Sequence, residues 1–229
     1  MSIRAIVTDI EGTTTEIQFV SQVLFPYAAA ALPDFIHQHQ YRPDVAAQLQ
    51  HIRQLINQPE ADTAQLIAIL LQWIQTDQKM TPLKELQGLV WASGYQNGTL
   101  KGHLYPDVLP ALTGWYRQGI GLYVYSSGSV AAQRLLFSHS VEGDISGLFL
   151  GHFDTHIGAK KDSSSYRAIA AQLALPATEI LFLSDHPDEI LAAQAAGWHC
   201  IQLLRDGQYS ELQPQATDFI QVNQLLEAL

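Results

Sequence analysis

The chain has few of the features that mark secreted or nucleic-acid-binding proteins. Cys200 is the single cysteine among 229 residues, so no disulfide can form within the chain, which fits a reducing compartment such as the cytoplasm. Only 12 Lys and Arg stand against 22 Asp and Glu, a formal net charge of -10. Because nucleic-acid backbones repel such a surface, the composition argues against a nucleic-acid partner. A small anionic substrate remains open, since a bound cation and a few aimed donors set the local field.

Long apolar runs are missing as well. The strongest one, residues 67–74, is interrupted by Gln72 and is far shorter than the roughly 20 residues that span a bilayer. The N-terminal apolar run stops at Asp9, with no basic region, apolar core and cleavage site in succession, so we expect no signal peptide. With 47% hydrophobic and 15% charged residues, the chain can build a sizeable core. We expect a cytoplasmic protein with no membrane partner, and nothing in the sequence demands an oligomer, so we expect a monomer.

The rest of the chain is organised around its N-terminal stretch, Ile3-Arg-Ala-Ile-Val-Thr-Asp-Ile-Glu-Gly-Thr-Thr-Thr15. A short β-branched run ends at Asp9, and Glu11 follows two residues later in a Gly-Thr turn. In open α/β folds, ligands bind at the carboxyl edge of the sheet, where such acids would lie. One carboxylate can attack an electrophile, the other can move a proton, and both can help to hold a hard cation. The alternative at this point is a solvated strand end.

Residues 16–104 look like a helical insertion after this first strand. Apolar residues recur with helical spacing and strand patterns are scarce. Proline and glycine separate the helices. The expected helices cover residues 17–36, 43–57, 63–76 and 82–93. We predict a cap domain here, with residues 1–15 and 105–229 forming the core. The alternative is that these helices simply cover one face of the sheet.

From residue 106 onward, strands and helices alternate, which is typical of a doubly wound, mostly parallel α/β sheet. The expected helices cover residues 107–118, 130–139, 164–173 and 188–196. The expected strands cover residues 121–125, 148–153, 180–183 and 200–203.

Three of the predicted strands end in polar clusters. Asp9 and Glu11 follow the first, Ser126 and Ser127 the second, and Ser184 with Asp185 the third. Parallel strands bring these ends to one edge, where a lysine or a cation must offset the acids. Lys160 or Lys161, in a loop before a helix, could supply that charge. Hydroxyls and free amides at the Ser126-Ser127-Gly128 turn suit phosphate oxygens.

Each feature has an ordinary alternative. Ser126 and Ser127 could be a helix N-cap, Lys160 a solvated surface lysine, and Asp185 the cap of a strand end. Glu189, one turn beyond Asp185, could orient a metal-bound water or be a surface acid. All of these alternatives would have to hold together to remove the predicted site.

The ordered set of acid pair, serine, lysine and late acid resembles the four motifs of the haloacid dehalogenase superfamily, whose fold is a Rossmann-like core with an inserted cap. Glu11 stands where most members have Asp. Further short motifs resemble the enolase-phosphatase (acireductone synthase) family of methionine salvage. They are Leu24-Phe-Pro-Tyr27, Leu83-Lys-Glu-Leu-Gln-Gly88, Tyr125-Ser-Ser-Gly-Ser-Val130, Gly151-His-Phe-Asp-Thr155 and Ser163-Ser-Ser-Tyr166.

The resemblance implies a Mg²⁺-dependent enzyme with one ion per chain and a small phosphorylated diketone as substrate. It implies that Asp9 attacks phosphorus and forms an aspartyl-phosphate, and that Glu11 moves protons. The implied catalytic residues are Asp9, Glu11 and Lys160, the phosphate-binding residues Ser126, Ser127 and Lys160, and the metal ligands Asp9, Glu11 and Asp185. The methylthio tail of the substrate needs an apolar pocket, for which Phe19, Leu24, Phe25 and Tyr27 are candidates; packing within the cap is the alternative for each.

The implied reaction converts 2,3-diketo-5-methylthiopentyl-1-phosphate, by enolisation and then dephosphorylation, to the acireductone 1,2-dihydroxy-3-keto-5-methylthiopentene. The nearest alternative is a generic Mg²⁺-dependent phosphomonoesterase of the same superfamily acting on another small metabolite. A metal-independent dehalogenase would not need the second acid, Glu11. A catalytically dead binding module should have lost Asp9 or Lys160, and both are present.

Overall fold

The computed structural model describes residues 2–207 and 210–226. By its internal contacts the chain divides into two compact units, residues 1–19 with 101–229 and residues 20–100. We predicted the insertion at residues 16–104, and the second unit lies inside those limits. The two units are described in turn.

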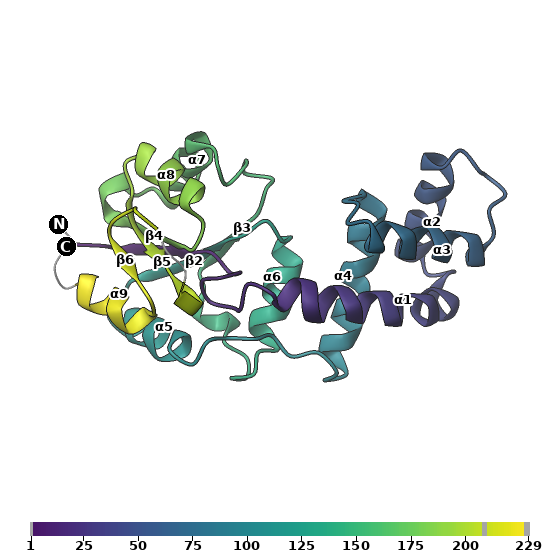
Figure 1. The fold of residues 1–229 in the computed structure, drawn as a ribbon, viewed down its shortest axis with the longest axis horizontal. Coiled ribbons are helices and arrows are strands. Elements are labelled where there is room, and N and C mark those ends of the chain that lie inside the picture. Colours follow the sequence, from purple (N-terminus) through teal and green to yellow (C-terminus); the bar gives the residue numbers. More distant parts are fainter. Residues whose placement is uncertain (1, 208–209, 227–229) are drawn as a thin grey trace. The chain divides into compact units, whose positions relative to one another are not determined.

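The larger unit is built on a six-stranded sheet with the order β3-β2-β1-β4-β5-β6, and every pair of neighbours is parallel (Figure 1). The strands are β1 (Ala5–Thr8), β2 (Gly121–Tyr125), β3 (Gly151–Phe153), β4 (Ile180–Ser184), β5 (His199–Leu203) and β6 (Gln215–Ala216). This confirms the predicted α/β class with a parallel, doubly wound sheet.

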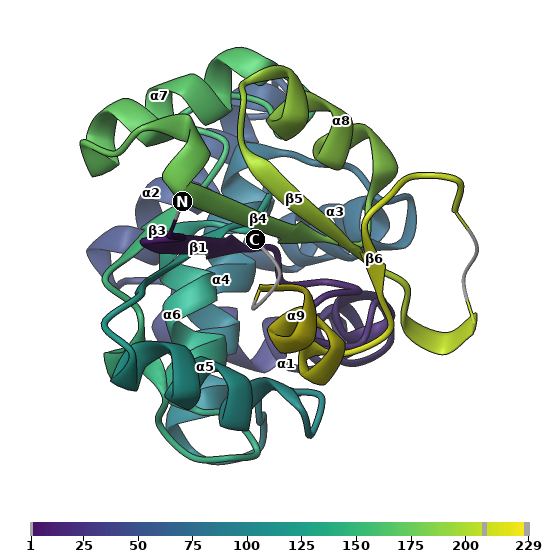
Figure 2. The same cartoon turned by 90° about the vertical axis from the view of Figure 1, so that its left-hand side faces the viewer.

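Helices cover both faces of this sheet. They are α5 (Val108–Arg117), α6 (Val130–Ser138), α7 (Ser163–Leu173), α8 (Pro187–Ala195) and α9 (Phe219–Leu226). Figure 2 shows α7 and α8 on one face and α5, α6 and α9 on the other. The right-handed βαβ crossovers expected of parallel strands put helices on both sides in this way.

The central strands are apolar because both of their faces are covered. Every residue of β1 and of β4 is buried, so these strands are nearly continuous apolar runs rather than alternating patterns. Thr8 pairs with Val124 of β2 and with Leu183 of β4. The carboxyl ends of the three strands therefore lie side by side, and the polar clusters that follow them in the sequence share one edge.

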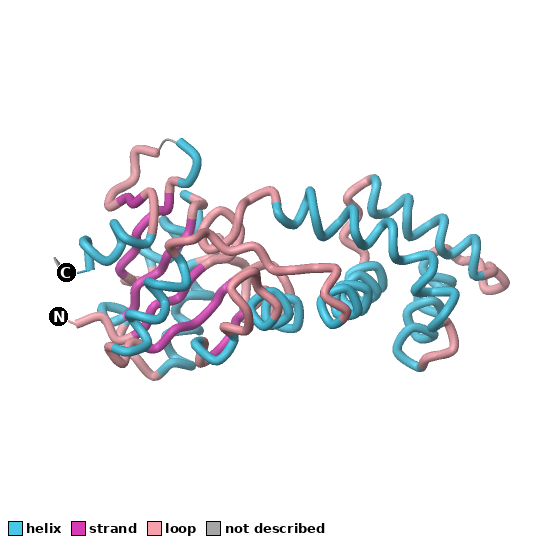
Figure 3. The backbone as a smooth tube through the Cα atoms, turned by 90° about the horizontal axis from the view of Figure 1, so that it is seen from below, coloured by secondary structure: helices cyan, strands magenta, loops and turns pink. Residues whose placement is uncertain are grey.

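The second unit consists of helices only (Figure 3). A π-helical turn (Val20–Leu24) leads into α1 (Phe25–His39), which is followed by α2 (Pro43–Leu55), α3 (Thr63–Gln75) and α4 (Thr81–Gln96). These helices share a core of their own that includes Leu32, Leu49, Leu70 and Leu86. A capping box between Asp62 and Gln65 begins α3, because the two side chains satisfy each other's free backbone N–H groups.

Two of the candidate tail-binding residues are engaged within this helical unit. The ring of Phe25 stacks on Trp91 with centroids 6.3 Å apart. Tyr27 lies against Gly94, where an added Cβ would come within 2.6 Å of its ring. For Phe25 and Tyr27, packing inside the insertion is thus what the structure shows.

Some predicted elements differ from those observed. The first predicted helix, residues 17–36, begins later and continues through Pro33 to His39, because apolar packing of α1 outweighs the lost hydrogen bond of one proline. The predicted extended stretch 148–153 begins on the last residue of a 3-10 turn (Ser146–Leu148), and only its second half forms β3. No element was predicted beyond residue 203, where β6 and α9 lie. No helix in the described part of the chain is long and apolar enough to cross a membrane.

Candidate active site

Asp9 stands at the carboxyl end of β1. Its backbone N–H donates to the carbonyl of Leu183 (2.8 Å), so the pairing with β4 continues one residue past β1. The turn that follows is tight, because the N–H groups of residues 13–15 all donate to the Ile10 carbonyl at 2.9–3.2 Å. Gly12 has a φ of +69°, a conformation that glycine adopts without steric cost. The carboxylate of Asp9 is thereby fixed at the sheet edge, and the residue is 6% exposed.

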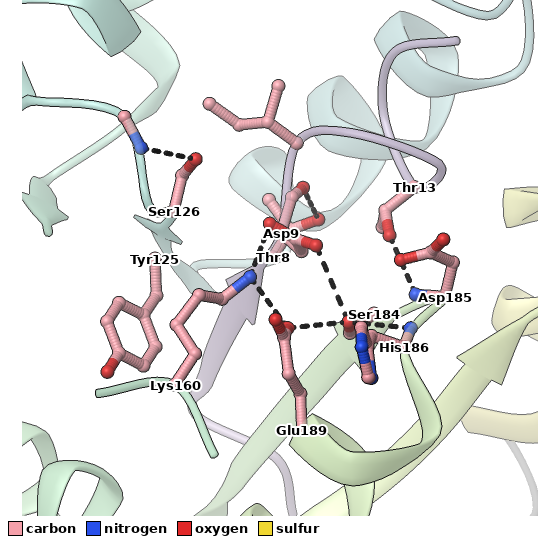
Figure 4. A network of polar contacts seen from close by, with 12 residues as sticks. Thr8, Asp9, Thr13, Tyr125, Ser126, Lys160, Ser184, Asp185, His186 and Glu189 are labelled. Carbon is pink, nitrogen blue, oxygen red and sulfur yellow. Dashed lines mark hydrogen bonds and ion pairs between the residues drawn. The ribbon is translucent and has the colours of Figure 1, made fainter. Parts of the chain in front are cut away.

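Lys160 meets Asp9 inside the protein. Its Nζ lies 2.6 Å from Oδ1 of Asp9 and 2.6 Å from Oε2 of Glu189, as Figure 4 shows. Burial alone would lower the pKa of Lys160, but the attraction of the two carboxylates outweighs burial and raises the pKa. The lysine is therefore a fixed positive charge at neutral pH. The alternative of a solvated surface lysine is wrong, since Lys160 is 6% exposed.

Glu189 belongs to this cluster through α8. Besides the ion pair with Lys160, it accepts a hydrogen bond from the Ser184 hydroxyl at 2.9 Å. The Ser184 Oγ also lies 3.5 Å from Oδ2 of Asp9. Burial, and then repulsion by Asp9, raise the pKa of Glu189. The surface-acid alternative for Glu189 is wrong, because the residue is only 7% exposed.

Asp185 follows Ser184 at the end of β4 and is held by its backbone. Its N–H donates to Oγ1 of Thr13 (3.0 Å), and its carbonyl accepts from Nε2 of Gln202 (2.7 Å). Burial, followed by repulsion from Asp9 and Glu189, raises the pKa of Asp185 to about 7. Three carboxylates are thus crowded around one lysine at the sheet edge.

The predicted magnesium ligands are Asp9, Glu11 and Asp185. Glu11 lies in the turn after Asp9, partly exposed, and forms a backbone bridge with Thr15. A Cβ at Gly12 would come within 2.3 Å of Oδ2 of Asp185, so the missing side chain lets the Glu11 turn approach that carboxylate. Carboxylate oxygens are the hard ligands that Mg²⁺ prefers, and the residues present fit this ion. The described residues contain no three His, Cys, Asp or Glu side chains already grouped as a metal site.

Ser126 and Ser127 continue the edge at the end of β2. Ser126 is buried, and its hydroxyl accepts a hydrogen bond from the N–H of Gly128 (3.2 Å). Ser127 is exposed. The N-cap of α6 is Ser129, which accepts from the N–H of Ala132 at 3.3 Å. The N-cap alternative is therefore wrong for Ser126 and Ser127, and these two residues form a turn ahead of the helix.

Arg205 is a buried residue of this region that the sequence reasoning missed. Its guanidinium donates to the Thr13 carbonyl at 2.8 and 3.2 Å and pairs with Asp107 at 2.9 Å. It also lies 4.2 Å from the centre of the Tyr105 ring. Because Thr13 contacts Asp185, Arg205 braces the turn between the first and the last acidic motif. The available signal was an arginine directly after the apolar run of β5.

Comparison with known proteins gives this geometry a context. A model of the haloacid dehalogenase-like hydrolases matches residues 3–197. A protein of Erwinia tasmaniensis named enolase-phosphatase is 56% identical over 225 residues, which cover 98% of each chain. An enolase-phosphatase of Pseudomonas aeruginosa is 52% identical over 222 residues, which cover 97% of this chain and 99% of that protein.

Solved structures agree on the fold. The Unknown transcript 4 protein of Saccharomyces cerevisiae superimposes with a TM-score of 0.81 at 31% identity, covering 95% of this chain and 98% of its own. A dehalogenase superimposes with a TM-score of 0.61 at 20% identity, over 98% of this chain and 97% of its own. At that identity the second likeness concerns the fold alone.

Proposed function

This chain belongs to the haloacid dehalogenase-like hydrolases and, among them, to the enolase-phosphatases, and from that membership we propose its reaction and the residues that perform it. The reaction converts 2,3-diketo-5-methylthiopentyl-1-phosphate to the acireductone 1,2-dihydroxy-3-keto-5-methylthiopentene and inorganic phosphate, a step of methionine salvage. The substrate class is a small phosphorylated diketone.

The observation that carries the assignment of roles is the buried contact between Lys160 and Asp9 at the carboxyl edge of the sheet. A carboxylate that is to attack a phosphate monoester faces a dianion and is repelled by it. An ammonium 2.6 Å away offsets that repulsion, and in a buried site it does so with little screening by water. We therefore assign Asp9 as the nucleophile and Lys160 as the counter-charge.

In the phosphoryl transfer, an oxygen of Asp9 forms a bond to phosphorus while the bond from phosphorus to the substrate oxygen breaks. Glu11 protonates the departing oxygen as general acid. Water then attacks the aspartyl-phosphate, Glu11 takes the proton, and the Asp9 carboxylate is released with phosphate. Ser126, Ser127 and Lys160 hold the phosphoryl oxygens during both steps.

Mg²⁺, one ion per chain, would be held by Asp9, Glu11 and Asp185, and when bound it neutralises charge on the phosphoryl oxygens. Glu189 fixes the position of Lys160 and, through Ser184, the orientation of the Asp9 carboxylate. Asp185 is repelled by Asp9 and Glu189, and a divalent cation bound among these carboxylates would offset that repulsion.

Enolisation precedes phosphate release and needs a proton to leave the carbon beside a carbonyl. The developing enolate oxygen requires a positive group, and the buried ammonium of Lys160 beside Asp9 can supply it. Glu11, partly exposed in the turn after Asp9, is suited to exchange protons with the leaving oxygen and with solvent. We further propose that the enzyme acts in the cytoplasm. We also propose that it is a monomer, and sedimentation at micromolar concentration would test its oligomeric state.

The test is incubation of the purified protein with the diketo phosphate and Mg²⁺, following inorganic phosphate chemically and the acireductone by its absorbance. We expect the two products in equal amounts. Phosphate release from the diketo phosphate without any enol would instead support the generic phosphomonoesterase. Absence of both products would overturn the proposed function.

A further inference from the structure

Gln133 on α6 is a buried amide that contacts the phosphate-site turn. It is 1% exposed, and its Nε2 donates to the carbonyls of Gly128 and Phe153, both at 2.8 Å. A buried amide is retained only when its hydrogen bonds are satisfied, because an unpaired one is costly. Both N–H donors of Gln133 are used, and both act on the backbone at the ends of β2 and β3.

His152 on β3 satisfies the other end of this amide. Its Nδ1 lies 3.1 Å from Oε1 of Gln133. Because the Nε2 of Gln133 is already turned toward two carbonyls, its Oε1 must be the acceptor, so His152 carries a proton on Nδ1. The order of the chain of bonds is therefore fixed: the ring donates to the amide, and the amide donates to the backbone.

The turn that Gln133 holds is attached at both ends to the carboxyl end of β3 and the residue after it. The N–H of Ser126 donates to the Phe153 carbonyl at 3.2 Å. The N–H of Val130 donates to Oδ2 of Asp154, also at 3.2 Å. Between these two points, the Gly128 carbonyl is held by Gln133. The turn therefore presents the hydroxyls of Ser126 and Ser127 from a backbone that is anchored at three places.

We propose that Gln133 is a positioning residue for the phosphoryl group, which fixes the turn of residues 126–128 so that its donors meet the phosphate oxygens. The inference rests on the proposed phosphatase function and adds to it a residue that does not touch the substrate. Donors that stabilise a transferring phosphoryl group must be pre-organised, and a misplacement of about 1 Å can reduce the rate by about 100-fold. A turn released from Gln133 loses this precision.

The experiment measures the affinity of the whole protein for orthovanadate, a phosphate analogue, in the presence of MgCl₂, by calorimetry. Gln133→Met keeps the length of the side chain and removes both of its hydrogen-bonding groups. We expect the dissociation constant to rise and kcat/KM to fall, each by about 10- to 100-fold.

Asn223→Ala provides the matched control. It also removes a side-chain amide contact, the partly buried one with the indole N–H of Trp115. Trp115 lies near the end of α5, just before β2 begins, and therefore at the opposite end of the sheet from the site. We expect this variant to lower thermal stability but to bind orthovanadate within twofold of the wild type.

A second pair of variants keeps the inference testable if Gln133→Met does not fold. His152→Leu removes the donor to Gln133, whereas His152→Asn places an amide N–H near the position of Nδ1. We expect weaker orthovanadate binding in the first, by about 3- to 10-fold, and rescue in the second. Equal binding by Gln133→Met and wild type, or equal losses in His152→Leu and His152→Asn, would overturn the inference. A wild-type protein that binds no orthovanadate would instead refute the phosphatase assignment and the inference with it.

Discussion

The ammonium of Lys160 lies 2.6 Å from Oδ1 of Asp9, and the two side chains are 5% and 9% exposed. Withdrawing both charges from water is costly, and their attraction offsets that cost only when the geometry is good. Because Glu189 shares the same ammonium, the cluster carries one positive and two negative charges. Together with burial, this excess of negative charge raises the pKa of the neighbouring Asp185. The same negative charge favours binding of a cation at this edge of the sheet.

Lys160→Met should reduce both stability and activity. It leaves two buried carboxylates without a counter-charge, and breaking a buried pair in this way costs about 3–5 kcal/mol. We expect a urea midpoint well below that of the wild type and no measurable phosphate release. In the double variant Lys160→Met with Glu189→Gln, one of the stranded charges is removed, so part of the stability should return while activity stays absent. A single variant as stable as the wild type would contradict the ion-pair account.

Asp9→Asn tests the nucleophile. An amide is a poor nucleophile and a neutral group of the same size, so the fold should survive while phosphate release falls by about 10⁴-fold or more, the scale found for removal of a covalent nucleophile. Single-turnover assays with the diketo phosphate would measure this. A variant that retains even a tenth of the wild-type rate would exclude Asp9 as the nucleophile.

The sequence was sufficient for the sheet and for the edge at which the acids gather, because buried parallel strands leave long apolar runs that end in polar residues. Strand 121–125 was predicted with the observed bounds. The partners of the acids were harder to predict, since the contact between Lys160 and Glu189 joins a loop to helix α8, 29 residues away in the sequence. Gln133 acts on backbone carbonyls, which any residue supplies, so no pattern of side chains identifies it. Arg205 is visible only as an arginine after the apolar run of β5, and its role depends on contacts with Thr13 and Asp107 that are distant in the sequence.

The C-terminal elements were missed for a different reason. β6 has two residues, too few to show the alternation that marks a strand. Its pairing with β5 and the packing of Phe219 against Trp115, with ring centroids 5.4 Å apart, are tertiary effects. Short edge strands depend on such contacts more than on their own residues.

His152 should make stability depend on pH. Burial, with a smaller contribution from Arg134, lowers its pKa from 6.5 to about 4. Between pH 6.5 and pH 4, His152 therefore binds a proton in the unfolded chain but not in the folded chain. The free energy of unfolding consequently falls as the pH drops from about 6.5 toward 4. Between pH 7 and pH 5 we expect the wild type to lose about 1–2 kcal/mol more than His152→Asn, as measured by urea unfolding. Equal losses in the two proteins would show that His152 does not titrate this way.

Removal of the metal should abolish turnover. We expect metal dependence because Asp9 and Asp185 are crowded at one edge of the sheet, with Glu11 in the adjoining turn. We expect phosphate release to stop in excess EDTA and to return when MgCl₂ is added back. Full turnover in excess chelator would contradict the metal assignment, and a far-ultraviolet spectrum unchanged by EDTA would show that the loss of activity is not a loss of fold.

Glu11→Gln tests whether one carboxylate serves both half-reactions. Glutamine keeps the size of the side chain and an oxygen able to touch a metal, but it cannot exchange a proton near neutral pH. Phosphate release should fall by about 10²- to 10⁴-fold, the usual contribution of a general acid. The measurement follows absorbance of the enol and release of phosphate in the same reaction.

The enol signal distinguishes two roles for Glu11. If this residue only protonates the leaving oxygen, enolisation continues, and the phosphorylated enol accumulates and is visible spectroscopically. If it is also the enolising base, the diketo phosphate persists and no enol appears. We expect accumulation, because a carboxylate placed at the leaving oxygen is poorly placed to take a proton from carbon as well. A Glu11→Gln protein that releases phosphate at the wild-type rate would defeat both versions, because neither role could then belong to this residue.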